Sequence, residues 1–189
     1  MKKVIVTIGR EFGSGGREIG LKLSEKLGIP FYDKKLIVHT AEKTNLEESI
    51  VERYDEQHSF PAFSSSNIFD IYQMPMSDRI YIAQADVIRD IAAKESCIIV
   101  GRCADFVLKD YENVIKVFIW APHDVCVKTV MDMFGMNEKD ADKRIRKINK
   151  HRSEHYRYYT CREWDNARNY DLCLNSADLG FNGCVEAIK

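Results

Sequence analysis

The stretch Lys3-Val-Ile-Val-Thr-Ile-Gly-Arg-Glu-Phe-Gly-Ser-Gly-Gly-Arg17 decides the fold class of this chain. Residues 3–8 form a short run of β-branched and apolar residues, which is typical of a strand buried on both faces of a parallel sheet. Glycines follow at once. Apolar residues then recur every four positions as far as Leu27, and Gly28 ends the pattern. The chain therefore opens as a strand, a glycine loop and a helix.

Strands and helices alternate along the rest of the chain. Residues 29–33 read as a short extended segment, and the runs 97–100, 114–120 and 170–174 read as strands. A helix is expected after Asp33, on the spacing of Leu36, Thr40, Ala41 and Thr44, and another after Asn45, with Glu48 as its capping partner. Further helices are expected around 80–91, from Pro122 with Cys126, Val130 and Met133 facing inward, after Asn137 with Asp140, and from about Gly183 to Lys189. This order predicts an α/β fold with a parallel sheet.

Length and composition narrow the class of protein. The 189 residues have a mass of 21.9 kDa and are 45% apolar, which predicts one domain with a full core. Lys and Arg number 28 and Asp and Glu 29, and this net charge of −1 argues against nucleic-acid binding. No apolar run approaches the ~20 residues that span a bilayer, and residues 4–8 are too short for a signal peptide. We expect a cytoplasmic protein with small-molecule partners.

The cysteines and histidines show no metal-binding pattern. The six cysteines are scattered without a Cys-x-x-Cys pair, which disfavours zinc ribbons and thioredoxin-type chemistry. We interpret them as reduced thiols, mostly in the core. The histidines have no ligand spacing either, so the only metal we expect is Mg²⁺ carried by a nucleotide. Residues 59–77 form an aromatic-rich loop whose role the sequence leaves open.

The glycine loop predicts a phosphate site. Glycines let backbone N–H groups approach phosphate oxygens, and a helix N-terminus favours anions. The match to the P-loop pattern G-x-x-x-x-G-K-[ST] is imperfect, because Gly16 or Arg17 occupies the lysine position and Arg17 or Glu18 the hydroxyl position. Arg17 or Arg10 could supply the missing positive charge. Ser14 or Glu18 could assist the metal.

Several motifs in this order resemble the bacterial cytidylate kinase-like family. They are Ile8-Gly-Arg-Glu-Phe-Gly-Ser-Gly-Gly-Arg-Glu-Ile-Gly20, Leu27-Gly-Ile-Pro-Phe-Tyr-Asp33, Ile99-Val-Gly-Arg102, Arg144 to Tyr159, and Tyr170-Asp-Leu-Cys-Leu-Asn-Ser176. The resemblance implies a three-layer P-loop nucleoside monophosphate kinase fold. Its core would be about 1–32, 95–135 and 168–189, with a helical monophosphate-binding insertion at about 33–94 and a mobile lid at about 137–165.

Two residues after strands point to the acceptor. Arg102 follows a buried strand, so it should lie at the carboxyl edge of the sheet, where open α/β sheets bind ligands. Its guanidinium suits a phosphate, and a surface salt bridge is the alternative. In the resembling motif Gly-Arg-Asp this arginine contacts the monophosphate, and Cys103 replaces the aspartate here. Asp33 lies where the monophosphate-binding region would begin, and a structural helix cap is its alternative.

The basic helix carries eight Lys or Arg between residues 139 and 157. Arg144, Lys147 and His151 share one face, and a lid that lays arginines over ATP would stabilise the charge of a transferring phosphoryl group. The pattern Asn149-x-x-Arg152 resembles the Asp-x-x-Arg of cytidylate kinase lids, which contacts base and phosphate. The alternative for each lysine is a solvated basic face.

These observations lead to one leading hypothesis and three others. The leading one is ATP- and Mg²⁺-dependent phosphoryl transfer to a nucleoside monophosphate, with CMP and dCMP as candidate acceptors. The others are a nucleotide-binding regulator with little turnover, a kinase for another small acceptor, and nucleic-acid binding through the basic helix, which the net charge disfavours. The expected catalytic residues are Arg17, Arg144 and Arg152; the expected ATP-binding residues are Gly13, Ser14, Gly15, Gly16, Arg17 and Glu18; and the expected substrate-binding residues are Asp33, Arg102, Asn149 and Arg152.

Overall fold

Five parallel strands form one sheet in the order β2-β3-β1-β4-β5 in the computed structural model, which describes residues 3–55 and 74–189. The strands are β1 (Ile5–Arg10), β2 (Phe31–Tyr32), β3 (Cys97–Val100), β4 (Val114–Trp120) and β5 (Leu172–Asn175). The parallel α/β fold expected from the sequence is confirmed. The central strand, β1, pairs with β3 on one side and with β4 on the other.

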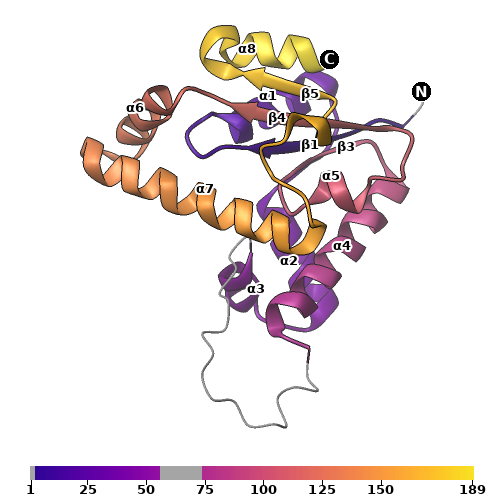
Figure 1. The fold of residues 1–189 in the computed structure, drawn as a ribbon. Coiled ribbons are helices and arrows are strands. Elements are labelled where there is room, and N and C mark those ends of the chain that lie inside the picture. Colours follow the sequence, from indigo (N-terminus) through magenta and orange to yellow (C-terminus); the bar gives the residue numbers. More distant parts are fainter. Residues whose placement is uncertain (1–2, 56–73) are drawn as a thin grey trace, which may run out of the picture.

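Helices cover both faces of the sheet and extend beyond one edge (Figure 1). They are α1 (Gly16–Leu27), α2 (Lys34–Thr44), α3 (Glu48–Tyr54), α4 (Met76–Lys94), α5 (Ala104–Val107), α6 (His123–Phe134), α7 (Glu138–Thr160) and α8 (Ser176–Ile188). Helices α1 and α8 pack together on one face, α4 and α5 lie on the other, and α2 packs on α4. Helix α7 crosses in front of the sheet and packs on α6.

The apolar run of β1 serves two cores because alternate side chains of a strand point to opposite faces. Ile5 packs with Ile88 and other residues of α4 and α5. Val6 and Ile8 pack with residues of α1 and α8, including Ile19. All of these side chains are buried. The absence of polar alternation in residues 5–8 therefore follows from burial of the strand on both faces.

Three local features of the predicted helices differ in the structure. Asn45 does not open a helix with Glu48; it ends α2 in the left-handed conformation, and Glu47 holds the N-cap position of α3. Met133 points outward, with 58% of its surface exposed. Helix α8 begins at Ser176, where the Asn175 side chain accepts a hydrogen bond from the Ala177 N–H and caps it. Gly180, with non-helical φ and ψ of 64° and 168°, divides α8 into two parts, and the predicted helix from about Gly183 lies in the second part.

Other expectations hold with small shifts. The first strand is Ile5–Arg10 rather than 3–8, and the last is Leu172–Asn175 rather than 170–174. Asn137 caps α7 by accepting from the Asp140 N–H, as predicted. The six cysteines form no disulfide, and four of them are buried. None of the helices in residues 3–55 and 74–189 is both long and apolar enough to cross a membrane. Most of the predicted loop 59–77 lies outside the described residues.

The topology places the candidate residues along one edge. Because all the strands are parallel, their carboxyl ends meet at the same side of the sheet. The glycine loop follows β1, Arg102 follows β3 and Asp33 follows β2, and these three strands are neighbours in the order β2-β3-β1. The sheet order therefore brings together three segments that are distant in sequence; Asp33 and Arg102 alone are 69 residues apart.

Candidate functional site

The glycine loop, residues 9–16, has a backbone that only glycine tolerates at two positions. Gly13 and Gly15 have φ of 90° and 74°, in the left-handed region. A Cβ on Gly13 would lie 2.8 Å from the Cys126 carbonyl oxygen, and one on Gly15 would overlap the Phe181 ring. The loop is therefore shaped by close packing against α6 and α8, and it leads directly into the N-terminus of α1.

The Ser14 hydroxyl faces into the protein. Ser14 is buried, and its Oγ lies 2.9 Å from the Glu11 carbonyl oxygen and 3.1 Å from that of Ile119. The Ser14 carbonyl in turn accepts from the Ser176 hydroxyl at 2.7 Å. These bonds fix the loop between β4 and α8, so Ser14 stabilises the loop from the protein interior.

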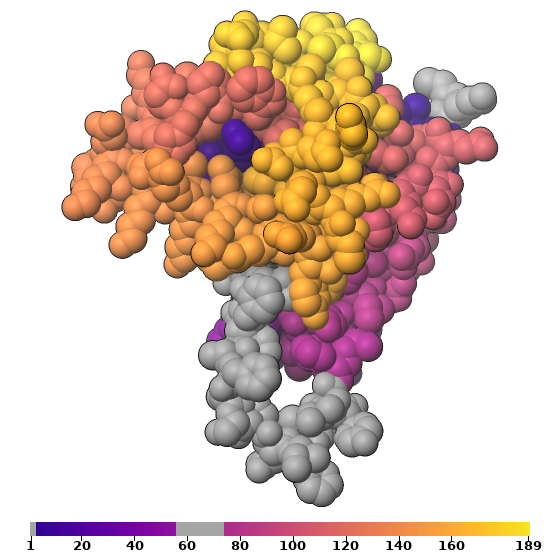
Figure 2. Space-filling view, viewed as in Figure 1, coloured from indigo at the N-terminus to yellow at the C-terminus, as the bar shows by residue number. Residues whose placement is uncertain are grey.

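A pocket with a cavity volume of about 220 Å³ lies over the glycine loop. It is lined by Arg10, Glu11, Phe12, Gly13, Gly15, Gly16, Arg17, Glu18, Met133, Phe134 and Arg152. Figure 2 shows the indigo N-terminal segment at the bottom of a hollow that α6, α7 and the C-terminal part of the chain surround. Three arginines around a helix N-terminus give this pocket the chemistry of an anion site.

Helix α7 is attached to the glycine loop through its Asn149–Arg152 face. The Asn149 Oδ1 accepts from the Phe12 N–H at 2.8 Å, and the Arg152 Nη1 donates to the Arg10 carbonyl at 3.1 Å. Arg144 lies farther along the helix, with its guanidinium 4.0 Å from the centroid of the Phe134 ring. Lys147 is exposed. The structure thus brings Asn149 and Arg152 to the loop and places Arg144 at the aromatic rim of the pocket.

Arg102 lies in a turn with unusual backbone geometry. Gly101, Arg102 and Cys103 are three consecutive left-handed residues, with φ of 74°, 53° and 52°. The left-handed region is unfavourable for residues with a side chain, and such strain concentrates at functional sites. The turn directs the Arg102 side chain into the protein, where only 4% of its surface is exposed.

Two carboxylates hold the Arg102 guanidinium. Its Nε and Nη2 donate to the two oxygens of Asp55 at 2.9 and 2.5 Å, and its Nη1 donates to Asp33 Oδ1 at 2.6 Å and to the Val100 carbonyl at 2.9 Å. Asp33 Oδ2 accepts from Arg17 Nε at 2.7 Å. Burial alone would raise the pKa of Asp33, but Arg102 and Arg17 hold that pKa below its ordinary value. Asp33 makes no capping bond at α2, so its carboxylate connects the loop arginine with the turn arginine.

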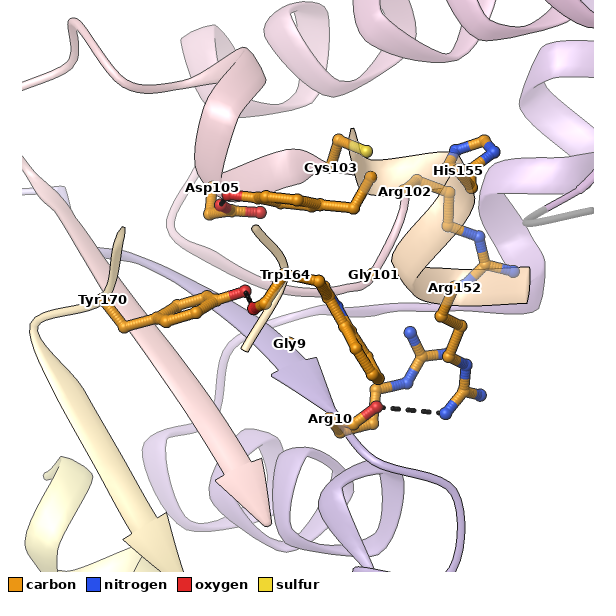
Figure 3. Close-up of a pocket in the computed structure, with 11 residues that line it drawn as sticks. Gly9, Arg10, Gly101, Arg102, Cys103, Asp105, Arg152, His155, Trp164 and Tyr170 are labelled. Carbon is orange, nitrogen blue, oxygen red and sulfur yellow. Dashed lines mark hydrogen bonds between the residues drawn. The ribbon is translucent and has the colours of Figure 1, made fainter. Parts of the chain in front are cut away.

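A second, smaller pocket of about 20 Å³ lies between the ends of β1 and β3 (Figure 3). Arg10, Arg102 and Arg152 line one side of it, and Trp164 and Asp105 line the other. The volume suffices for about one water molecule. Asp105 is buried and accepts from the Tyr156 hydroxyl at 2.7 Å. Burial raises the pKa of Asp105, and this hydrogen bond opposes the shift.

The donor groups fit a magnesium ion carried by a nucleotide but do not form a metal site of their own. No group of three or more His, Cys, Asp or Glu in the described part of the chain could hold a metal. Glu11 and Glu18 line the pocket over the glycine loop, and one or two carboxylates plus phosphate oxygens are the usual ligands of such Mg²⁺. Burial raises the pKa of Glu11, and a hydrogen bond from the Ala121 N–H opposes this.

The sequence missed the residues that complete the site. Asp55, at the end of α3, makes the bidentate pair with Arg102, and Gln84 donates to Asp55 at 3.0 Å. Phe12 and Phe134 form the aromatic rim, with ring centroids 6.1 Å apart. The sequence offered a surface salt bridge as the alternative for Arg102, and the structure shows salt bridges that are buried, since the Arg102 side chain is 4% exposed. Nothing in the spacing singled out Asp55.

Comparisons with known proteins identify the family of the chain. The family model described as the cytidylate kinase-like family matches residues 5–178. An uncharacterized protein from Eubacterium ventriosum is 31% identical, with a TM-score of 0.75, and the match covers 98% of this chain and 96% of that one. No curated protein matches the chain by sequence.

Two shikimate kinases share the fold at low identity. The enzyme from Bacteroides thetaiotaomicron is 15% identical, with a TM-score of 0.58, and the match covers 98% of this chain and 95% of that one. The enzyme from Acinetobacter baumannii, whose structure contains shikimate, is 12% identical with a TM-score of 0.54, covering 99% and 91%. These similarities show the P-loop kinase fold.

Proposed function

Since the chain belongs to the cytidylate kinase-like family, we propose that it transfers the γ-phosphoryl group of ATP to a nucleoside monophosphate, with CMP and dCMP as the first candidates. One observation carries the proposal: the pocket over the glycine loop and the Arg102 turn lie side by side at the carboxyl edge of the sheet. A donor and an acceptor at these two places would meet between β1 and β3.

On the donor side, the glycine loop and the N-terminus of α1 would bind the ATP phosphates through backbone N–H groups. Arg17 and Arg152 line the same pocket and would supply the positive charge that the P-loop lysine gives elsewhere. Bound Mg²⁺ would offset charge on the β- and γ-phosphates, with Glu18 or Glu11 as its protein ligand. Phe134 and Arg144, at the rim, would border the rest of the nucleotide.

On the acceptor side, Arg102 would bind the monophosphate, and Asp33 would hold Arg102 and Arg17 in place. An acceptor oxygen attacks the γ-phosphorus, the bond to the β-γ bridging oxygen breaks, and ADP leaves with those electrons. Helix α7 would act as the lid, with Asn149 and Arg152 over the reacting groups. Such a reaction depends mainly on positioning and electrostatics, which these arginines provide.

The direct test is ADP formation with Mg²⁺-ATP and a panel of nucleoside monophosphates. We expect ADP only with particular monophosphates, and a loss of about 10²-fold or more in Arg152→Ala, since removing one group that stabilises the transition-state charge costs this much. Lys150→Ala is the matched control. Lys150 lies on the same helix, but its side chain is 74% exposed to solvent and pairs with Glu154. Equal ADP formation in both variants would indicate a contaminating kinase and contradict the proposal.

A second candidate function is transfer to another small acceptor. The shared fold with shikimate kinases favours it, because fold does not fix the acceptor. ADP formation with hydroxyl-bearing acids but with none of the monophosphates would select this candidate.

A third candidate is a nucleotide-binding regulator. The observation in its favour is that Gly16 and Arg17 stand where the P-loop lysine would be, and Arg17 pairs with Asp33. ATP that raises the melting temperature without any ADP formation would select this candidate.

A further inference from the structure

Arg102 meets its two carboxylates in different ways. Both oxygens of Asp55 accept hydrogen bonds, one from Nε and one from Nη2 of the guanidinium, whereas one oxygen of Asp33 accepts from Nη1. The bidentate fork that Asp55 occupies is the geometry in which arginine binds a phosphate. With Asp55 in place, 4% of the Arg102 side chain is exposed. A monophosphate therefore cannot reach this fork while the Asp55 carboxylate remains on it.

The surroundings make Asp55 the exchangeable partner. Asp33 is bound by two arginines, since Arg17 holds its second oxygen at 2.7 Å. Asp55 has both oxygens on one arginine, and its other bond is from the neutral Gln84 amide at 3.0 Å. Asp33 follows a strand of the sheet, but Asp55 ends the seven-residue helix α3. If Asp55 turned away, Arg102 would keep its bonds to Asp33 and to the Val100 carbonyl.

The charges around Arg102 also favour exchange of Asp55 for an anion. Among the four ion-paired groups, Arg17 and Arg102 carry two positive charges and Asp33 and Asp55 two negative ones, so these four sum to zero, 2 − 2 = 0, while Arg10 and Arg152 line the pocket beside Arg102. Without Asp55 the sum is 2 − 1 = +1. Removal of the Asp55 carboxylate therefore makes the surroundings of the fork more favourable for an anion.

We propose that the Asp55 carboxylate is an internal competitor of the acceptor, occupying the Arg102 fork until the phosphate monoester of the substrate displaces it. This inference rests on the proposed function in that the acceptor is a monophosphate. It makes Asp55 a specificity-determining residue, because only an acceptor group able to bond both Nε and Nη2 replaces what Asp55 provides. A neutral hydroxyl cannot supply two charged acceptor oxygens at the fork.

The test is anion binding to Asp55→Asn. Asparagine keeps the shape but loses the charge and one acceptor oxygen, so we expect the Kd for inorganic phosphate and for CMP, measured by calorimetry, to fall roughly tenfold or more, the range of one charged hydrogen bond. Asp90→Asn is the matched control, an exposed aspartate paired with Lys43 at 2.9 Å. An unchanged or higher Kd in Asp55→Asn would overturn the proposal.

A second variant keeps the test decisive if Asp55→Asn folds poorly. Gln84→Leu removes the amide that steadies Asp55 and leaves all four charges in place. We expect a smaller fall of Kd for inorganic phosphate, about threefold, the lower end for one neutral hydrogen bond. No fall, or weaker binding, would again contradict the exchange.

The outcome separates this inference from the proposed function. If Asp55→Asn binds phosphate more tightly but no monophosphate supports ADP formation, the exchange stands and the proposed acceptor is wrong. If the wild-type protein forms ADP with a monophosphate but the variant gains no affinity, the proposed function stands and the exchange is wrong.

Discussion

The two arginine-containing sides of the site are built in opposite ways. At the glycine loop, Arg17 is 50% exposed and lines an open pocket of about 220 Å³. At the end of β3, Arg102 is 4% exposed, two aspartates hold it, and about 20 Å³ remain beside it. Arginine is thus accessible to a ligand at the glycine loop, the open side of the site, and buried in the protein interior at Arg102, the filled side.

This difference teaches how burial divides the roles of a residue type. An exposed ion pair contributes little to stability because water screens it. A buried ion pair matters for stability because removing one partner leaves the other charge buried without compensation. We therefore expect the Arg102 side to matter first for folding and the glycine-loop side first for nucleotide binding.

The largest effect is expected for Arg102→Ala compared with Arg17→Ala. Arg102→Ala leaves Asp33 and Asp55 buried without their main partner and should lower the free energy of unfolding by about 3–5 kcal/mol. Arg17→Ala should lower it by less than about 1 kcal/mol, yet weaken ATP binding. Urea denaturation and ATP titration measure the two quantities. Equal destabilisation by both variants would break the comparison.

A second prediction concerns the backbone of the open side. Gly13→Ala combines a left-handed φ with a Cβ 2.8 Å from the Cys126 carbonyl, and should cost about 2–4 kcal/mol and abolish ATP binding. Gly135→Ala is the matched control, because Gly135 has a φ of 63° with open space around it and should cost about 1–2 kcal/mol without affecting ATP binding. Thermal melts with and without ATP would show both. ATP binding that survives in Gly13→Ala would contradict the structural role of the loop.

The open side was the part that sequence could predict. The strand at residues 5–10, the glycine loop and α1 follow one another in the chain, so local patterns identified them together. Strand β4 was predicted at its observed bounds because its apolar run, interrupted by Lys116 alone, ends at Trp120, two residues before Pro122. Asn149 and Arg152 were assigned to substrate, whereas the structure shows them bonded to the backbone of Phe12 and Arg10.

The filled side was predicted only in part: Arg102 and Asp33 were both expected at the acceptor site, but their meeting with Asp55 was not, because these residues are distant in sequence. Asp55 lies 47 residues before Arg102 and Asp33 lies 69 before it. Their meeting depends on the order of β2, β3 and β1 and on where α3 ends. The three left-handed residues at 101–103 likewise give no sequence signal beyond Gly101, because arginine and cysteine rarely adopt that conformation.

The third prediction separates two buried aspartates near Arg102, Asp105 and Asp33, by pH. The pKa of Asp105 is raised above its ordinary 3.8. The contribution of Asp105 to the free energy of unfolding is therefore complete at low pH and is lost as pH rises from 3.8 through the raised pKa. The pKa of Asp33 is lowered, so its contribution is present above 3.8 and is lost as pH falls through the lowered value. Each pH unit within such a window changes the free energy of unfolding by about 1.4 kcal/mol.

Asp105→Asn should therefore gain stability relative to the wild-type protein as pH rises from about 4, and Asp33→Asn should lose its deficit as pH falls below that value. Chemical denaturation at a series of pH values measures both differences. Slopes of the same sign for the two variants would show that the aspartates do not have opposite environments.

The smallest effect is expected at the rim of the open side. The Arg144 guanidinium lies 4.0 Å from the centroid of the Phe134 ring, and both residues are largely exposed, so Arg144→Gln should lower the free energy of unfolding by only about 0.5–1 kcal/mol. Arg146→Gln is the control on the same helix, where the exposed Asp142 pair predicts a similarly small change. If Arg144 borders the bound nucleotide, ATP affinity should fall in Arg144→Gln and stay constant in Arg146→Gln. An equal affinity in both variants would confine Arg144 to packing, and the open side would then end at the glycine loop, Arg17 and Arg152.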